Sequence, residues 1–262
     1  MLTQAYRSSE PIRPNDSEKR HVFSVIIPVI HEGATIYAFI QRLHQQFSHE
    51  SFETIVVDGD AEGSTLQKLP SLPGVVKTIS PPGRGHQMNA GARLAQGEIL
   101  LFLHADTGLP KKAFAHIRRV MADKRYVAGA FKLGFESERW IFKVLEVTTS
   151  WRSRLTRLPY GDQAFFMSKA YFSRIGGFRE IPIMEDVDLM RRIKHRKEQV
   201  HVSTTVKIKT SVRRWEQEGL VYSFFRTWIL VSLYFLGWPP EKLAQYYRAD
   251  ESSQEQREWR SS

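Results

Sequence analysis

Short apolar segments that end at polar turn residues constrain the fold of this chain more than any other feature. They cover residues 23–27, 52–57 and 99–103, and they are closed by Pro28, by Asp58-Gly59 and by His104-Ala105-Asp106. Apolar runs of this length, bounded by chain breakers, are typical of buried strands. Because the apolar character of the runs is nearly continuous and does not alternate with polar residues, we expect parallel strands that are covered on both faces.

Helical patterns lie between and after these runs. Residues 35–47 and 111–124 carry apolar side chains at spacings of three and four, residues 85–95 form a shorter, glycine-opened pattern, and residues 75–79 fit a fourth strand. Strands that alternate with helices predict right-handed βαβ units, and therefore an α/β fold with a mostly parallel sheet flanked by helices. Ligands of such sheets bind beyond the carboxyl ends of the strands. Asp58 and Asp106 occupy that position.

The second half of the chain has a more mixed pattern. We expect a strand at residues 128–133, a short apolar run at 164–167, helices at 140–151 and 186–194, and a long aromatic-rich segment at 220–236 that is followed by a short helix. Hydrophobic residues make up 42% of the chain and aromatic residues 12%, which is enough to form a core. We find no internal repeat and no low-complexity tract.

Composition limits the possible chemistry. The chain has no cysteine, so disulfides and thiolate metal sites are excluded, and any metal must use oxygen or imidazole ligands. Residues 1–21 lack an apolar signal-peptide core, and we expect a flexible leader there. The net charge is +10, and residues 191–214 hold nine Lys or Arg and one acid. This basic block forms either a solvated face or a surface that attracts phosphates, nucleic acid or an anionic membrane.

Three side chains suit a nucleotide diphosphate at the strand ends. Asp58 can accept a hydrogen bond from a base or a ribose hydroxyl, and Asp106 can hold a hard divalent cation through oxygen. Arg84 lies in a glycine-flexed loop before a helix and can fork onto a phosphate or cover a base. The alternative for a strand-end Asp is a helix cap or a turn contact.

Four segments of the sequence together resemble a known family. They are FSVIIPVIHEG, TIVVDGD, GRGHQMNAGARLAQGEILLFLHAD and YGDQAFFMSKAYFSRIGGF, the last followed by MEDVDLMRRI. In this order they resemble the family 2 glycosyltransferases of the GT-A (Rossmann-like) fold. They are especially similar to the small bacterial subgroup described as radical-SAM/selenodomain-associated transferases. The resemblance extends from Phe23 to Tyr247 and is most specific from Arg84 to Asp106.

The resemblance implies a division of the chain. Residues 22–215 correspond to a GT-A catalytic domain, in which 22–110 form the nucleotide-binding half and 111–215 the acceptor half. Residues 216–262 correspond to a C-terminal extension of amphipathic helices and a polar tail.

The resemblance also implies roles for individual residues. It assigns nucleotide-sugar binding to Pro28, Glu32, Asp58, Arg84, Gln87, Asn89 and Asp106. It assigns metal binding to His104 and Asp106, and acceptor or phosphate contacts to Asp162, Arg214 and Trp215. Glu185 and Asp186 match the acidic pair that supplies the general base, and we select Asp186.

Two departures from the family pattern affect these assignments. His104 replaces the first acid of the Asp-x-Asp metal motif, and because imidazole suits transition metals, Mn²⁺ becomes a reasonable alternative to Mg²⁺. DGDAEGST replaces the commoner DGGSTD pattern, so Asp60 and Glu62 add negative charge near an anionic ligand.

The expected function is that of an inverting glycosyltransferase. It would move a sugar from a nucleotide-diphosphate sugar, by resemblance a UDP-sugar, to a hydroxyl acceptor; lipid-like acceptors are among the alternatives. Two other functions remain open: a nucleotidyltransferase of the same fold, or a basic nucleic-acid-binding module. No nucleic-acid-binding motif supports the last, so we expect no specific nucleic acid partner.

Residues 220–238 have one charge in 19 residues, on Arg226. A spanning helix needs about 20 apolar residues, and a charge in its first third is costly. Trp228, Tyr234 and Trp238 are aromatic anchors of the interfacial kind. The segment therefore favours contact with a membrane surface or a hydrophobic acceptor, with a plain core helix as the alternative. We expect a cytoplasmic protein, with peripheral association at the inner face of the cell membrane.

Overall fold

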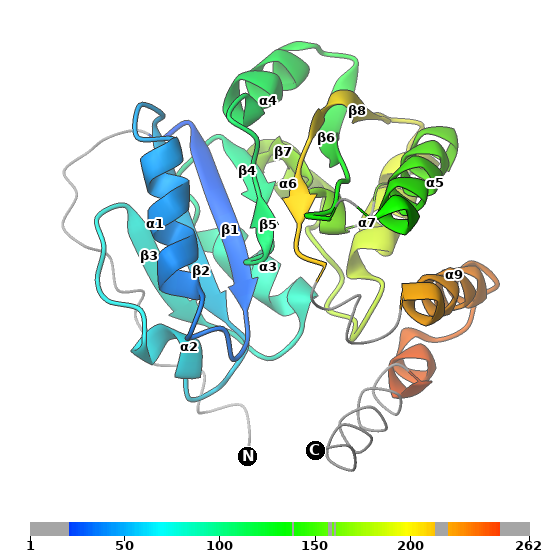
Figure 1. Cartoon of the computed structure of the whole chain (residues 1–262), viewed down its shortest axis with the longest axis horizontal. Helices are drawn as coiled ribbons and strands as arrows, with labels where there is room; N and C mark the ends of the chain where they lie inside the picture. The colour runs from blue at the N-terminus through cyan, green and yellow to red at the C-terminus, as the bar shows by residue number, and fades with distance from the viewer. Residues whose placement is uncertain (1–20, 138, 157–158, 160, 213–219, 247–262) are drawn as a thin grey trace.

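The structure is a computed structural model that describes residues 21–137, 139–156, 159, 161–212 and 220–246 (Figure 1). Residues 1–20 of the expected leader, together with Arg214 and Trp215, lie outside the described residues. A seven-stranded sheet with the order β3-β2-β1-β4-β7-β6-β8 forms the centre of the molecule, with helices on both of its faces. The expected α/β class and the mostly parallel sheet are confirmed.

The first half of the sheet is parallel, as predicted. Its strands are β1 (Phe23–Val29), β2 (Phe52–Asp58), β3 (Val75–Ile79) and β4 (Ile99–Phe102). The connecting helices are α1 (Ile36–Gln46), α2 (Ser64–Gln67) and α3 (Arg84–Leu94). In the register of β1 and β2, Val29 pairs with Asp58, so both strands end at the same edge of the sheet.

The second half introduces antiparallel pairs. Strand β7 (Phe166–Ser168) lies antiparallel between β4 and β6 (Tyr126–Lys132), and β8 (Gln199–Lys207) is a parallel edge strand beside β6. Helices α4 (Ala113–Ala122), α5 (Trp140–Thr156), α6 (Lys169–Ile175) and α7 (Glu185–His195) and the 3-10 turn η1 (Gly161–Gln163) complete this half.

Two further elements lie outside the central sheet. Strands β5 (Thr107–Gly108) and β9 (Lys209–Thr210) form a small antiparallel sheet. Helix α9 (Leu220–Phe235) follows, and residues 240–246 form a last described helix. None of the helices in the described ranges is both long enough and apolar enough to cross a bilayer.

The core is divided by the sheet into two layers. On one face α1 and α4 pack on the sheet, and the rings of Phe23, Phe47 and Phe52 surround that of Phe114. On the other face α3, α6 and α7 pack on the sheet, where Phe102 contacts other phenylalanine rings. The spacings of three and four predicted for residues 35–47 are confirmed, because Ile36, Phe39, Ile40 and Leu43 of α1 are buried.

Candidate active site

A cavity of about 760 Å³ opens at the carboxyl ends of β1 and β4. Its walls come from the loop after β1, from α1, from the start of α3 and from the segment between β4 and β5. Six of the residues selected from the sequence line it: Pro28, Glu32, Arg84, Gln87, His104 and Asp106. The volume is in the range of small-molecule sites, and the strand-end position is the one expected for an open α/β sheet.

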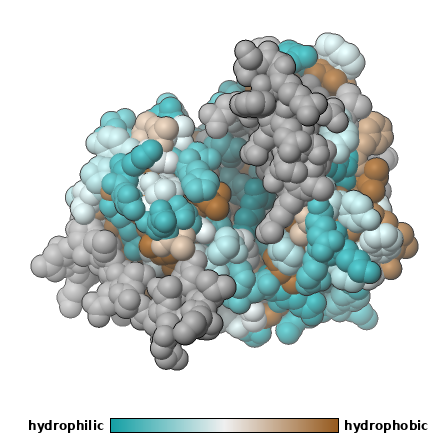
Figure 2. All heavy atoms as spheres, turned by 90° about the horizontal axis from the view of Figure 1, so that it is seen from below, coloured by the Kyte–Doolittle hydropathy of each residue, from teal (hydrophilic) through white to brown (hydrophobic). Residues whose placement is uncertain are grey.

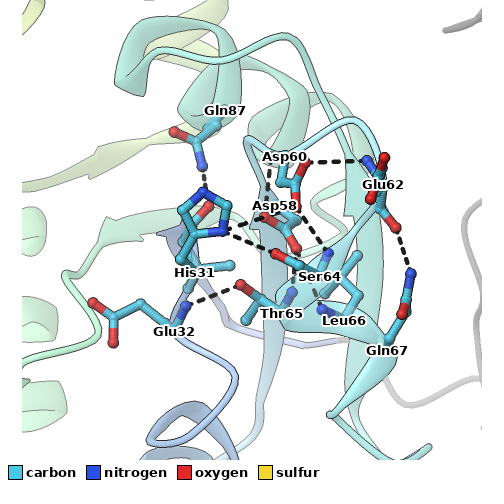
Figure 3. A network of polar contacts seen from close by, with 11 residues as sticks. His31, Glu32, Asp58, Asp60, Glu62, Ser64, Thr65, Leu66, Gln67 and Gln87 are labelled. Atoms are coloured by element: carbon cyan, nitrogen blue, oxygen red, sulfur yellow. Dashed lines mark hydrogen bonds and ion pairs between the residues drawn. The ribbon is translucent and has the colours of Figure 1, made fainter.

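Asp58 organises the loop beside this cavity (Figure 3). Its side chain is fully buried. One carboxylate oxygen accepts a hydrogen bond from the backbone N–H of Asp60 at 3.1 Å, and the other accepts from the N–H groups of Thr65 at 2.9 Å and Leu66 at 3.3 Å. The carboxylate is therefore engaged with the loop, as in the turn-contact alternative. A direct contact between Asp58 and a nucleotide stays a prediction.

The negative charge of Asp60 is also used within this loop. Its two carboxylate oxygens accept from the backbone N–H groups of Glu62 at 3.2 Å and Ser64 at 3.3 Å. Hydrogen bonds from Ser64 and Glu62 lower the pKa of Asp60. The turn in the unusual DGDAEGST segment is thus held by a carboxylate.

The loop after β1 is tied to the same segment (Figure 3). His31 adopts a left-handed φ of 56°, and its Nδ1 lies 3.1 Å from Oγ of Ser64. The N–H of Glu32 donates to Oγ1 of Thr65 at 3.1 Å, and Thr35 donates to the Glu32 carboxylate at 2.8 Å. Two loops from neighbouring strands therefore form one wall, with Glu32 facing the cavity.

Gln87 and Asn89 both lie on α3, but their side chains have different hydrogen-bond partners. The Gln87 amide donates to the carbonyl groups of Val29 at 2.7 Å and Val57 at 2.9 Å, so it joins β1 to β2 at the edge of the cavity. Asn89 forms a reciprocal pair of 2.9 Å hydrogen bonds with the backbone of Phe178. The Asn89 side chain thus holds the segment before α7 and does not line the cavity.

The segment after β4 carries Asp106 at the end of an apolar strand. Asp106 is exposed in a turn at the tip of the strand, and its side chain accepts from Oγ1 of Thr107 at 3.0 Å. The N–H of Ser211 donates to the Asp106 carbonyl at 3.2 Å, and β5 pairs with β9. The strand therefore supports Asp106, and the turn holds residues 209–211, which precede the predicted Arg214-Trp215 element.

The acidic pair lies at the start of α7. Glu185 is 6% exposed, and its burial, with the neighbouring charge of Asp186, raises the pKa of Glu185, while Arg84 acts in the opposite direction. Glycine at position 85 lets the start of α3 lie close to Arg179 and Glu185. A Cβ there would lie 2.6 Å from the Arg179 carbonyl oxygen and 3.5 Å from Cβ of Glu185. Arg84 lines the cavity, and its charge acts on Glu185, so it connects the cavity with the acidic pair.

Asp186 is more accessible than Glu185. One of its oxygens accepts from the N–H of Val187 at 2.7 Å, and the other accepts from the N–H of Gly161 in η1. This contact brings η1, and with it Asp162, to the start of α7. The predicted acceptor residue and the predicted base are thus neighbours in the structure.

Sequence analysis missed Asp188. This buried carboxylate is bound by Nε of Arg192 at 2.7 Å and by the Tyr234 hydroxyl at 3.1 Å, and Arg179 lies 3.3 Å from it. The i,i+4 spacing of Asp188 and Arg192 was the available signal. No pattern in the sequence indicated the contact of Asp188 with Tyr234 of α9.

The donor groups at the strand end fit a divalent cation that is shared with a ligand. No group of three His, Asp or Glu side chains gathers as a metal site in the described part of the chain. Mg²⁺ and Mn²⁺ sites commonly use one or two carboxylates and complete their shell with phosphate oxygens and water. Asp106 could supply such a carboxylate, with His104 beside it. A metal held by these two residues, and the preference for Mn²⁺, stay predictions.

These features define a GT-A-like α/β protein, with a nucleotide-sized cavity, a strand-end carboxylate and a separate acidic pair. The model of the family described as glycosyl transferase family 2 matches residues 24–181, and the chain belongs to this family. The matches support the family and not the narrower radical-SAM-associated subgroup, which stays a prediction.

Two curated relatives are similar over part of their length. An uncharacterized glycosyltransferase of Bacillus subtilis, YfnE, is 35% identical over 101 residues, which are 36% of this chain and 26% of that protein. An uncharacterized glycosyltransferase of Haemophilus influenzae is 33% identical over 87 residues, 32% of this chain and 29% of that protein. The matches therefore span less than a third of either relative.

Solved structures show the same fold. A mannosyltransferase from Pyrobaculum calidifontis, in complex with GDP-Man and Mn²⁺, has a TM-score of 0.56 at 19% identity and covers 86% of this chain and 69% of its own. S. aureus TarS 1–349 has a TM-score of 0.55 at 20% identity and covers 75% and 62%. A further TarS structure contains UDP-GlcNAc.

Proposed function

We propose that this protein is an inverting glycosyltransferase that uses a nucleotide-diphosphate sugar, by resemblance a UDP-sugar, and a hydroxyl acceptor. One observation carries the proposal: Arg84 lines the strand-end cavity, and the next residue, Gly85, lies against Glu185 at the start of α7. A donor held in the cavity would thus have its reactive end near a carboxylate. The nucleotide sugars bound by the solved relatives support this donor class.

The donor side binds and neutralises the leaving group. The Arg84 guanidinium can fork onto diphosphate oxygens. A divalent cation held by Asp106, with His104 beside it, would supply charge neutralisation for the leaving nucleoside diphosphate. Glu32 faces the cavity from the loop after β1 and can accept a hydrogen bond from a ribose or base.

The acceptor side removes a proton. Asp186 accepts the proton of the acceptor hydroxyl as the oxygen attacks the anomeric carbon and the bond to the diphosphate breaks. A single displacement by one base inverts the anomeric configuration. The backbone N–H groups of Gly161 and Val187 donate to the Asp186 carboxylate and fix its position. Glu185 is buried beside Asp186, and the positive charge of Arg84 acts on it.

The test compares two amide variants of the acidic pair. We expect Asp186→Asn to lower turnover by about 10²- to 10⁴-fold, while donor affinity stays close to that of the wild type. Glu185→Gln should lower turnover less. Turnover with a panel of nucleotide sugars and donor affinity by calorimetry are the measurements, with circular dichroism as the check on folding. Asp123→Asn, at a half-buried acid paired with Arg125, is the matched control.

Each other outcome has a defined meaning. If Glu185→Gln is inactive and Asp186→Asn is active, the base is Glu185. If both variants keep full turnover, the mechanism is wrong. Release of diphosphate in place of nucleoside diphosphate would identify a nucleotidyltransferase.

A further inference from the structure

Helix α9 is apolar on two opposite sides. Leu230, Val231 and Tyr234 are buried on one side and pack with Val187 of α7 and Leu243. The opposite side exposes large side chains at helical spacing: Tyr222, Phe225, Trp228, Ile229 and Phe235, which are 45–59% exposed. Leu236, which follows the helix, is 78% exposed. A surface helix of a water-soluble monomer normally presents a polar outer side. The outer side of α9 is therefore suited to an apolar environment.

A groove continues this surface. It has a volume of about 460 Å³ and is lined by Tyr222, Phe225, Arg226, Ile229, Leu230, Leu233, Trp238 and Tyr246. All of these side chains except Arg226 are aliphatic or aromatic. Trp and Tyr have an apolar body and a polar edge, which suits the boundary between water and lipid.

Helix α5 adds a second exposed apolar stripe. Trp140, Val144 and Val147 follow each other at spacings of four and three and are 74%, 49% and 63% exposed. Helices α5 and α9 lie at the same end of the molecule (Figure 1), and hydrophobic side chains gather at the right-hand side of Figure 2, where that end lies. We call the exposed apolar residues of α5, α9 and residues 236–246 the apolar end.

Positive charge borders the apolar end. Among the described residues, Arg139 and Lys143 lie at the start of α5, and Arg191 lies on α7, which packs against α9. The guanidinium of Arg191 lies 6.0 Å from the ring centre of Tyr234, and that of Arg226 lies 5.6 Å from that of Tyr222. An apolar surface with aromatic and cationic side chains around it has the chemistry of an interfacial membrane helix.

We propose that the apolar end docks on the surface of an anionic lipid bilayer. Two other occupants fit less well. A second copy would bring the same cations to the interface in a chain whose net charge is already +10. Residues 247–262 have Tyr247 and Trp259 as their only large apolar side chains, so this segment supplies little apolar area.

Vesicle flotation tests the docking surface. The full chain is mixed with vesicles of phosphatidylcholine alone or of equimolar phosphatidylcholine and phosphatidylglycerol. We expect binding to the anionic vesicles, and a loss of at least about tenfold in the triple variant Phe225→Ser, Trp228→Ser, Ile229→Ser, which removes buried area on the lipid side. Tyr37→Ser is the matched control, because Tyr37 is an exposed aromatic residue on α1.

Four results would overturn the proposal: no flotation with either vesicle, equal flotation with both, flotation that the triple variant leaves unchanged, or a wild-type dimer in light scattering that the triple variant converts to a monomer. The dimer would make the apolar end an interface between copies. Nucleotide-sugar affinity, measured in parallel without vesicles, should be the same in wild type and triple variant. A wild type that floats but binds no nucleotide sugar would contradict the proposed function alone.

Discussion

His116 is a buried residue whose protonation the fold opposes. It is 4% exposed on α4, and its ring lies 5.6 Å from that of Phe131 and 5.4 Å from that of His201. Burial, followed by the positive charges of His201 and Arg119, lowers the pKa of His116 to about 4. The unfolded chain, with an ordinary pKa of about 6.5, therefore binds this proton first as the pH falls.

We expect the free energy of unfolding to decrease as the pH falls from about 6.5 to about 4. The contribution of His116 should reach about 2 to 3 kcal/mol at the acidic end. Denaturant unfolding at pH 7.5 and pH 4.5 measures it. His116→Phe should reduce the difference between the two pH values by this amount, whereas His49→Gln, at an exposed histidine, should not. An unchanged difference in His116→Phe would contradict the assigned pKa.

The hydrogen-bond partners of the predicted site residues could not be read from the sequence. The sequence predicted nucleotide-sugar contacts for Asp58, Gln87 and Asn89. It did not show that Asp58 caps a loop, that Gln87 joins two strands or that Asn89 holds Phe178. A strand-end polar residue can satisfy either a ligand or the backbone, and only the three-dimensional structure shows which partner is in reach.

At the scale of elements, α9 is coupled to α7 through one buried polar contact. The Tyr234 hydroxyl donates to the Asp188 carboxylate at 3.1 Å, next to the first turn that carries the acidic pair. We expect Tyr234→Phe to lower the free energy of unfolding by about 1.5 to 3 kcal/mol, because a hydrogen bond to a charged group is lost and the ring stays. Denaturant unfolding measures the change.

The control for this contact is Tyr246→Phe. Tyr246 is 63% exposed, and removal of its hydroxyl should leave stability unchanged. Equal effects in both variants would show that the Tyr234 contact does not stabilise the docking of α9.

Elements with a regular apolar pattern were predictable, and those with a mixed pattern were not. Strand β8 lies within the basic block, and its residues vary from buried to exposed without a period of two. The charge pattern of this segment suggested a solvated face or an anionic partner. It did not predict a strand, because the parallel pairing of β8 with β6 depends on residues distant in the sequence. The short strands β5 and β9 were not predicted, because they pair with each other across a long stretch of sequence.

At the scale of the whole molecule, the cavity joins parts of the chain that are distant in sequence, from Pro28 to Ser211. A ligand that binds only the folded state should therefore stabilise the molecule. UDP with Mn²⁺ at 100 times the dissociation constant would add about 2.7 kcal/mol, or roughly 5 to 10 °C in Tm. Asp106→Asn keeps an oxygen for the Thr107 hydroxyl, so we expect an unchanged Tm without ligand and loss of the Mn²⁺-dependent part of the shift. Asp123→Asn should keep the full shift. If Asp106→Asn also keeps it, the metal is held elsewhere or plays no part in nucleotide binding.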